Sequence, residues 1–184
     1  MSTTNANLDL ACPYTSCFYG YFGSACGIAF SCLGSAYGTA KAGKGVMAAG
    51  VMKPNAAMKN TLPVIMAGIL GIYGLINAIV ANTVIKSSGD GILAGRVPLM
   101  TSFAALAAGL CTGLSALAAG IAIGVTGNAG VRAVARKPKL FVVMLLTLVF
   151  GEALALYGLI IALILLFSGG GDICKAAQNG GVTN

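Results

Sequence analysis

The sequence has very few charged residues and lacks two residue types altogether. Only 8% of its 184 residues are charged, and it contains no His and no Trp. A soluble domain carries about 25% charged residues, so this chain has too few of them to cover a surface that faces water. The missing imidazole also argues against a histidine-based zinc enzyme and against a Ser-His-Asp hydrolase.

Long apolar runs are what the sequence has instead, with 58% hydrophobic residues. Each run exceeds the roughly 20 residues that a helix needs to cross a bilayer. Only helices and closed barrels satisfy their backbone groups in lipid, and the strands of a barrel are shorter and alternate in polarity. The pattern therefore predicts an all-α membrane protein with four transmembrane helices. The predicted spans are 16–40, 62–85, 99–125 and 140–167.

The basic residues gather in two of the predicted connections, and neither of these contains an acid. By the positive-inside rule, both connections face the cytoplasm and both termini face the opposite side. The net charge of +7 is thus explained by membrane topology, and we predict no nucleic-acid partner. The connection between the first two spans holds Lys41, Lys44, Lys53 and Lys59, and that between the last two holds Arg132, Arg136, Lys137 and Lys139.

The two halves of the chain repeat. Lys53-Pro54 recurs as Lys137-Pro138, and the motif at 73–76, Tyr-Gly-Leu-Ile, recurs at 157–160; both pairs differ by 84 positions. Two motifs at one offset indicate a duplicated helical hairpin, with both copies in the same orientation. The predicted organisation is a luminal segment 1–15, hairpin 1 at 16–85, a luminal loop 86–98, hairpin 2 at 99–167 and a flexible luminal tail 168–184.

Glycines follow one face of the first span and one face of the third. Such faces let helices pack closely, whereas the second and fourth spans are bulkier. Because the inner circumference of a ring is shorter than its outer one, the glycine-rich spans suit the inside and the bulky spans suit the lipid-facing outside. An ordinary four-helix bundle is the alternative. The residues are Gly20, Gly23, Gly27, Ser31, Gly34 and Gly38, and Gly109, Gly113, Gly120, Gly124 and Gly127.

Glu152 is the one charged residue within the predicted spans. It lies twelve residues into the last span, about 18 Å along a helix and so near the middle of the bilayer. An acid at this depth is costly and is a functional candidate by default. Apolar surroundings favour its neutral form, and water or a cation favours its ionised form, as a proton carrier requires. The alternative is a neutral side chain that only bonds two helices, but the equivalent position in hairpin 1 is Gly68.

Two tyrosines are candidates to support the acid. Tyr157 lies five residues after Glu152, and Tyr73 lies five residues after Gly68. Either hydroxyl is placed to donate a hydrogen bond to Glu152 within one chain or between chains, and the alternative is that both tyrosines only pack.

Neither a metal site nor a cofactor is predicted. Gly38, Gly43 and Lys44 fit the spacing of a phosphate-binding loop, but Gly45 stands where Ser or Thr is needed and a membrane helix replaces the required strand. The cysteines form no Cys-x-x-Cys pair and are interpreted as packing residues. Whether the three cysteines near the chain ends come together in space is left open by their spacing; they are Cys12, Cys17 and Cys174.

Five motifs of the chain are distinctive. They are Pro63-Val-Ile-Met-Ala-Gly68, Ile72-Tyr-Gly-Leu75, Gly34-Ser-Ala-Tyr-Gly-Thr-Ala-Lys41, Gly127-Asn-Ala-Gly-Val-Arg132, and Gly151-Glu152 followed by Leu156-Tyr-Gly-Leu-Ile160. With these motifs the chain resembles, from about Cys12 to Phe167, the proteolipids that form the membrane ring (c-ring) of eukaryotic vacuolar-type (V-type) proton ATPases.

The resemblance implies a ring of proteolipids beside a static membrane subunit, which holds an essential arginine and two half-channels. The family's proton-carrying glutamate maps onto Glu152. Other subunits hydrolyse ATP, so this chain would not itself be an enzyme, and central-stalk subunits would contact its cytoplasmic loops. The implied location is a vacuolar or other acidic endomembrane. The alternatives are a ring that carries sodium, and a non-rotary channel or junction-forming protein.

Overall fold

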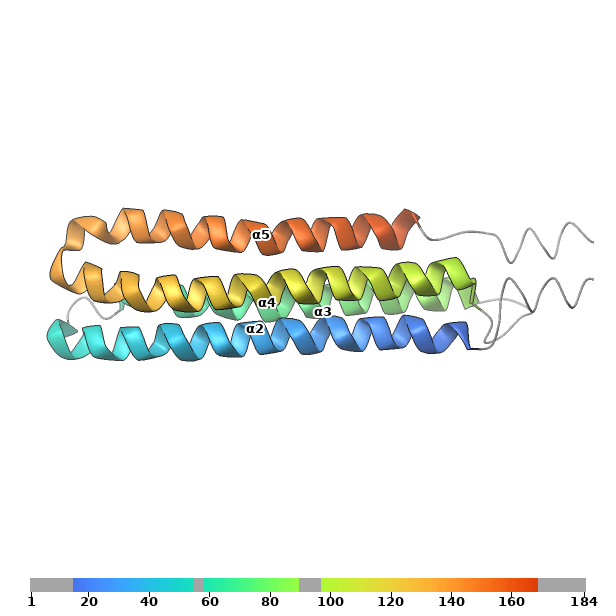
Figure 1. Ribbon diagram of the computed structural model, residues 1–184, viewed down its shortest axis with the longest axis horizontal. Coiled ribbons are helices and arrows are strands. Elements are labelled where there is room, and N and C mark those ends of the chain that lie inside the picture. The colour runs from blue at the N-terminus through green and yellow to red at the C-terminus, as the bar shows by residue number, and fades with distance from the viewer. Residues whose placement is uncertain (1–14, 55–57, 90–96, 169–184) are drawn as a thin grey trace, which may run out of the picture.

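The computed structural model describes residues 15–54, 58–89 and 97–168, and this part of the chain forms four long helices side by side (Figure 1). All four are long and apolar enough to cross a membrane. The predicted all-α membrane fold is therefore confirmed. The helices are α2 (Ser16–Met52), α3 (Leu62–Gly89), α4 (Leu99–Arg136) and α5 (Phe141–Ser168), with short 3-10 turns η2 (Lys59–Thr61) and η3 (Pro138–Leu140) before α3 and α5.

Helices α2 and α4 are longer than the predicted spans, so four of the basic residues assigned to connections lie on helices instead. α2 has 37 residues, and at 1.5 Å per residue it is about 55 Å long, well beyond a hydrocarbon core of about 30 Å. The helix continues because Ala, Met and Lys favour it and no proline intervenes before Pro54. The residues concerned are Lys41, Lys44, Arg132 and Arg136.

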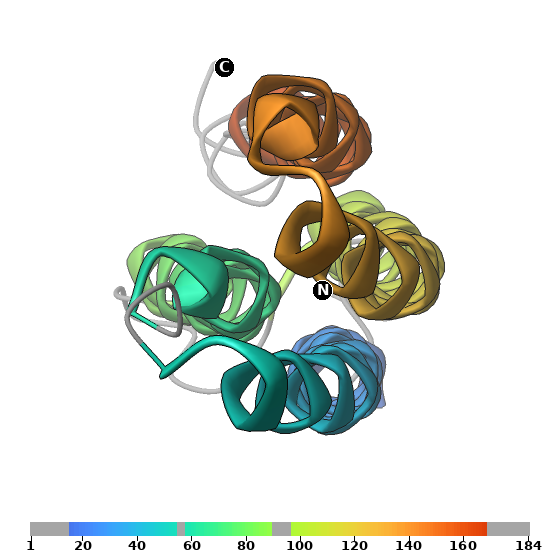
Figure 2. The same ribbon diagram turned by 90° about the vertical axis from the view of Figure 1, so that its left-hand side faces the viewer.

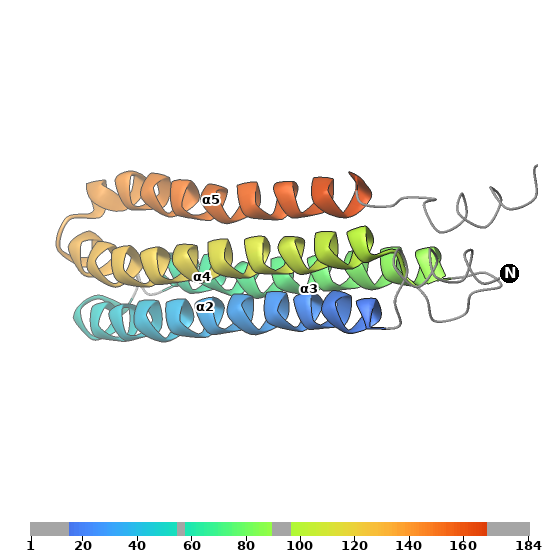
Figure 3. The same cartoon turned by 45° about the vertical axis from the view of Figure 1, so that its right-hand side comes forward.

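The chain direction confirms two tandem hairpins in the same orientation. α2 and α4 run one way and α3 and α5 run the other, so both turns within hairpins lie at one end of the bundle (Figures 1 and 3). α2 begins and α5 ends at the opposite end. Most of the predicted N-terminal segment, luminal loop and C-terminal tail, with Cys12 and Cys174, lies outside the described residues.

The repeat extends to single hydrogen bonds. The Lys53 N–H donates to the Ala49 oxygen at 3.0 Å, and the Lys137 N–H donates to the Ala133 oxygen at 2.9 Å. Both lysines have extended backbones, as expected before a proline. Gly74 of α3 faces Ser31 of α2, just as Gly158 of α5 faces Ser115 of α4. The two hairpins are therefore built alike, 84 positions apart.

The glycine faces of α2 and α4 meet each other inside one chain. The end-on view shows α2 and α4 as neighbours, with α3 and α5 beside them (Figure 2). A Cβ at Gly109 would overlap the carbonyl oxygen of Gly23, and one at Gly120 would overlap that of Gly34. We call this contact the glycine seam. It is the reason that the two helices need residues without side chains here.

Candidate functional site

Glu152 lies in the middle of α5 on the face that turns toward the rest of the bundle. It is 8% exposed. Leu148 and Ala155 lie one turn before and one turn after it, and both are buried in an apolar cluster to which all four helices contribute. The neighbouring Gly151 faces Ile123 of α4. An acid is therefore held at an apolar contact between helices.

The Tyr73 hydroxyl of α3 donates a hydrogen bond to Oε1 of Glu152, with an O–O distance of 2.9 Å. Tyr73 is half-buried and packs against the same apolar cluster. This bond joins the two bulkier helices, one from each hairpin. It can form with either the neutral or the ionised carboxyl group, because a carboxyl oxygen accepts in both states.

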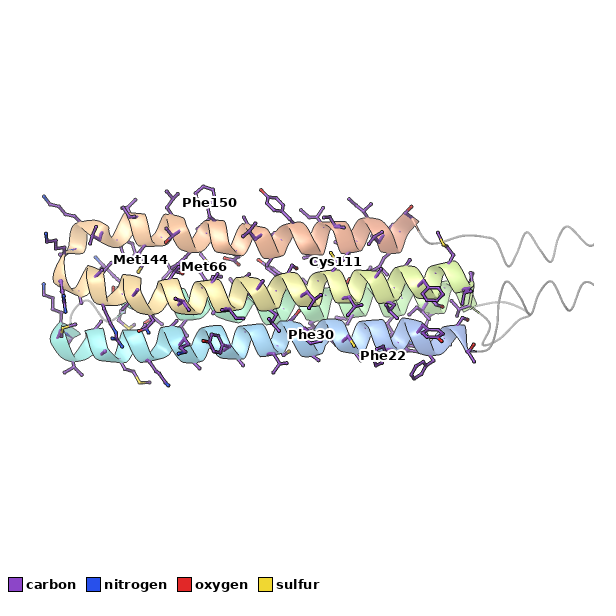
Figure 4. All side chains as sticks on the ribbon, in the orientation of Figure 1. Phe22, Phe30, Met66, Cys111, Met144 and Phe150 are labelled. Atoms are coloured by element: carbon purple, nitrogen blue, oxygen red, sulfur yellow. The ribbon has the colours of Figure 1, made fainter. Side chains whose placement is uncertain are left out.

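Tyr157 does not share this role within one chain. Its side chain is 60% exposed, whereas its repeat partner Tyr73 is turned inward. Figure 4 shows how the two sides of α5 differ, since Met144 points toward α4 and Phe150 points away from the bundle. Of the two candidate tyrosines, the structure thus brings only Tyr73 to Glu152, and sequence alone gave no basis for choosing between them.

The basic residues lie far from the acid along the bundle. The eight basic residues of the two predicted connections are exposed and lie at the end that carries the turns or on the last helical turns leading to it, whereas Lys86 is exposed near the other end of α3. Lys41 also lies over the ring of Tyr37, 5.7 Å from its centroid. Among the described residues we find no ion pair to Glu152 and one hydrogen-bond donor, Tyr73.

Asn77 is a buried polar residue of α3. It is fully buried, and both polar atoms of its amide lack a hydrogen-bond partner among the described residues. Its amide nitrogen lies 3.5 Å from where a Cβ on Gly27 would be, so the side chain faces α2.

The spacing that resembles a phosphate-binding loop does not form such a loop, because Gly38, Gly43 and Lys44 all lie within α2.

Comparison with known proteins assigns this arrangement to a class. The family of the ATP synthase C subunit matches residues 22–81 and again residues 106–165, two segments of equal length whose starts and ends both differ by 84 positions. The chain is therefore a membrane proteolipid with two tandem hairpins of this type, and it belongs to the ATP synthase C-subunit family.

One relative gives a more particular similarity. The V-type proton ATPase 16 kDa proteolipid subunit of Chrysotila carterae is 54% identical over 154 residues, which cover 84% of this chain and 93% of that protein. The similarity thus extends over nearly the whole of that relative rather than over one hairpin.

Replacing Tyr73 by Phe is expected to slow proton transport without stopping it. The substitution removes the 2.9 Å hydrogen bond to Glu152 and keeps the aromatic ring. One such bond contributes about 0.5–1.5 kcal/mol, so the initial rate of ATP-driven acidification should fall roughly two- to tenfold. Tyr157→Phe is the matched control and should leave the rate unchanged. Equal effects of the two substitutions would show that the Tyr73 bond has no special role.

Proposed function

We propose that Glu152 is the proton carrier of this chain, and that the chain is a rotor subunit in the membrane ring of a V-type proton ATPase. The observation that carries the proposal is the one acid of the described residues, buried at mid-helix in a four-span member of the C-subunit family. The similarity to a V-type proteolipid supports the particular ATPase. Other subunits hydrolyse ATP, and this chain is a membrane subunit that moves ions rather than a catalytic one.

The mechanism follows from the two states of one carboxyl group. While α5 lies next to lipid, Glu152 is neutral, and the Tyr73 hydroxyl holds its carboxyl group in place. When rotation brings it beside the arginine of the static membrane subunit, the positive charge favours the carboxylate and the proton leaves. The proton passes to the luminal half-channel. Reloading from the cytoplasmic half-channel makes the acid neutral again before α5 returns to lipid.

The exposed charges indicate the orientation of the chain in the membrane and its partners, and the bulky helices indicate which side of the ring faces lipid. The end with the exposed basic residues faces the cytoplasm, so α2 begins and α5 ends on the luminal side. The same end meets the central stalk, whose rotation turns the ring. α3 and α5 lie on the outer side of the ring next to lipid, and α2 and α4 line its inner side. The membrane is that of a vacuole or another acidic compartment.

The polar groups around Glu152 also bear on the alternative of a sodium-carrying ring. A hard metal cation needs several oxygen ligands. Within the described ranges, the Tyr73 hydroxyl is the polar group that contacts Glu152, while the Asn77 amide faces α2. This scarcity of oxygen ligands favours protons.

Labelling Glu152 with a hydrophobic carbodiimide tests the choice of ion. The neutral carboxyl group protonates the carbodiimide and its oxygen then adds to the central carbon, so labelling should be fastest at low pH and should not change when Na⁺ replaces K⁺ at constant ionic strength. The Glu152→Gln chain is the control and should not be labelled within its membrane spans. Protection of Glu152 by Na⁺ would contradict the proton proposal and favour the sodium ring.

A further inference from the structure

A cavity lies at the end of the bundle that carries the turns, between the first hairpin and the second. Figure 2 views the bundle from this end. The volume of the cavity is about 800 Å³, and sites for small molecules commonly enclose about 300–1,000 Å³. We call it the turn cavity. Its lining includes Lys53, Lys59 and Asn60 of the first hairpin and Val134, Pro138 and Phe141 of the second.

The turn cavity has a basic side and an apolar side. Lys53 and Lys59 are both exposed, and the described residues of the lining include no acid. The apolar side is formed by the buried Val134, the half-buried Phe141 and the exposed ring of Pro138. Such a lining suits a molecule that combines a negative charge with an apolar part.

Asn60 adds a polar group that has no partner. Its side chain is 1% exposed, and neither polar atom of its amide has a hydrogen-bond partner among the described residues. Leaving a buried amide unpaired is costly. The last torsion of an asparagine side chain is broad, so the amide can turn toward a molecule in the cavity. A ligand with acceptor oxygens would satisfy the amide N–H groups.

The repeat shows that the scaffold itself does not need these polar residues. In the second hairpin, the positions equivalent to Lys59 and Asn60 are Val143 and Met144. Met144 is buried in the apolar cluster of the bundle, so an apolar side chain fills the equivalent place there. A packing role alone would be served by apolar residues in both hairpins. The lysine and the amide are therefore particular to the side of the turn cavity that the first hairpin supplies.

The turn cavity lies at the depth of the lipid headgroups. Phe141 precedes Glu152 by eleven residues, about 16 Å along α5. Half of a hydrocarbon core is about 15 Å, so with Glu152 near mid-bilayer the cavity lies where acyl chains give way to headgroups. α3 and α5 begin beside it, and both carry exposed apolar side chains in their first turns, Ile65 and Val142. An acyl chain can therefore continue from the cavity along apolar surface.

We propose that the turn cavity binds an anionic phospholipid of the cytoplasmic leaflet. The ammonium groups of Lys53 and Lys59 hold its phosphate group, and the Asn60 amide donates to a phosphate or ester oxygen. The first carbons of an acyl chain lie against Phe141 and Val134. Basic pockets between transmembrane helices on the cytoplasmic side recognise such headgroups. The inference rests on the orientation given under the proposed function, and it adds a ligand that joins the turns of the two hairpins.

Lipid retention by the assembled ring tests the site. The ring is released in detergent from the purified complex, phosphatidylserine and phosphatidylcholine are added in equal amounts, and native mass spectrometry counts the molecules retained per chain. K53Q/K59Q neutralises the two lysines of the cavity. K137Q/K139Q is the matched control, because it removes the same charge from the same end but outside the lining. We expect roughly tenfold less phosphatidylserine on the first variant and a change within about twofold on the second.

Asn60→Leu provides a second measurement, since leucine keeps the volume and removes the amide. The lipid-free variant ring should melt at a higher temperature than wild type, because a buried unpaired amide is gone. Added phosphatidylserine should raise the melting temperature of the wild-type ring and raise that of the variant less. An equal rise in both would contradict the inference, because the amide would then play no part in binding.

Three further outcomes would overturn the lipid site. Equal loss of phosphatidylserine in the two lysine variants would mean that surface charge alone attracts the lipid. Stabilisation of the wild-type ring by inorganic phosphate as strong as that by phosphatidylserine would identify a site for a free anion. Phosphatidylserine that binds the released ring but is missing from the intact complex would mean that another subunit fills the cavity. Carbodiimide labelling tests Glu152 separately, so failure of the lipid site is distinguishable from failure of the proposed function.

Discussion

Gly109→Ala is expected to destabilise the folded chain strongly, while Gly71→Ala stabilises it slightly. The two substitutions add the same methyl group to transmembrane helices of the same bundle. At Gly109 the new Cβ overlaps the backbone carbonyl of Gly23, and at Gly71 it makes ordinary contact with Ser35, at 3.5 Å. Whether the substitution lowers or raises the stability of the fold therefore depends on which atoms the new methyl group contacts.

The magnitudes follow from packing. Over-packing in a core costs about 1–3 kcal/mol, and a clash with backbone cannot be relieved by a change of rotamer, so Gly109→Ala should lie at or above the top of this range. Gly71→Ala should gain about 0.4–1 kcal/mol, because alanine loses less conformational entropy in a helix. The measurement is the free energy of unfolding of the detergent-purified chain in denaturant. A similar stability for both variants would mean that the glycine seam is not formed.

Most of the fold could be predicted from the sequence because the bilayer imposes simple rules. Apolar runs of sufficient length, basic connections and one repeat offset specified four helices and two parallel hairpins. The helix ends were predicted less well. Lys41 and Lys44 are charged and suggested a connection, yet they continue α2 to Met52, because lysine favours helices and extends into water beyond the lipid.

The candidate site could be predicted in part. The position of Glu152 was evident, since a single acid in an apolar span stands out. The choice of Tyr73 over Tyr157 was not, because the two residues are equivalent in the repeat and differ only in which face the helices turn inward. The sequence likewise did not reveal which helix each glycine face contacts. Spacing alone showed that they favour close contact, whereas the structure shows that α2 and α4 supply that contact to each other.

Glu152→Gln is expected to abolish proton transport and to leave assembly intact. Glutamine has nearly the same shape, and its amide oxygen still accepts the hydrogen bond from Tyr73, so the contact between α3 and α5 is kept. The amide does not bind and release a proton near neutral pH, so the carrier is lost. Glu152→Asp keeps an acid but shortens the side chain by one methylene, about 1.5 Å, away from Tyr73, and should give partial transport.

A non-rotary channel or junction-forming protein predicts a different result for the same substitution. In such a protein the acid only joins helices, so a glutamine that keeps the hydrogen bond would serve equally well. Assembly alone does not separate these functions, because both expect a folded Glu152→Gln chain. Proton movement does separate them.

The most direct test is therefore ATP-driven acidification of sealed vesicles that contain the assembled complex, compared for wild type, Glu152→Asp and Glu152→Gln. Native gels of the same vesicles verify that each variant is assembled in equal amount. The account predicts full acidification for wild type, a reduced rate for Asp and none above background for Gln. Acidification by the Gln variant at the wild-type rate would contradict the central claim that Glu152 carries the proton.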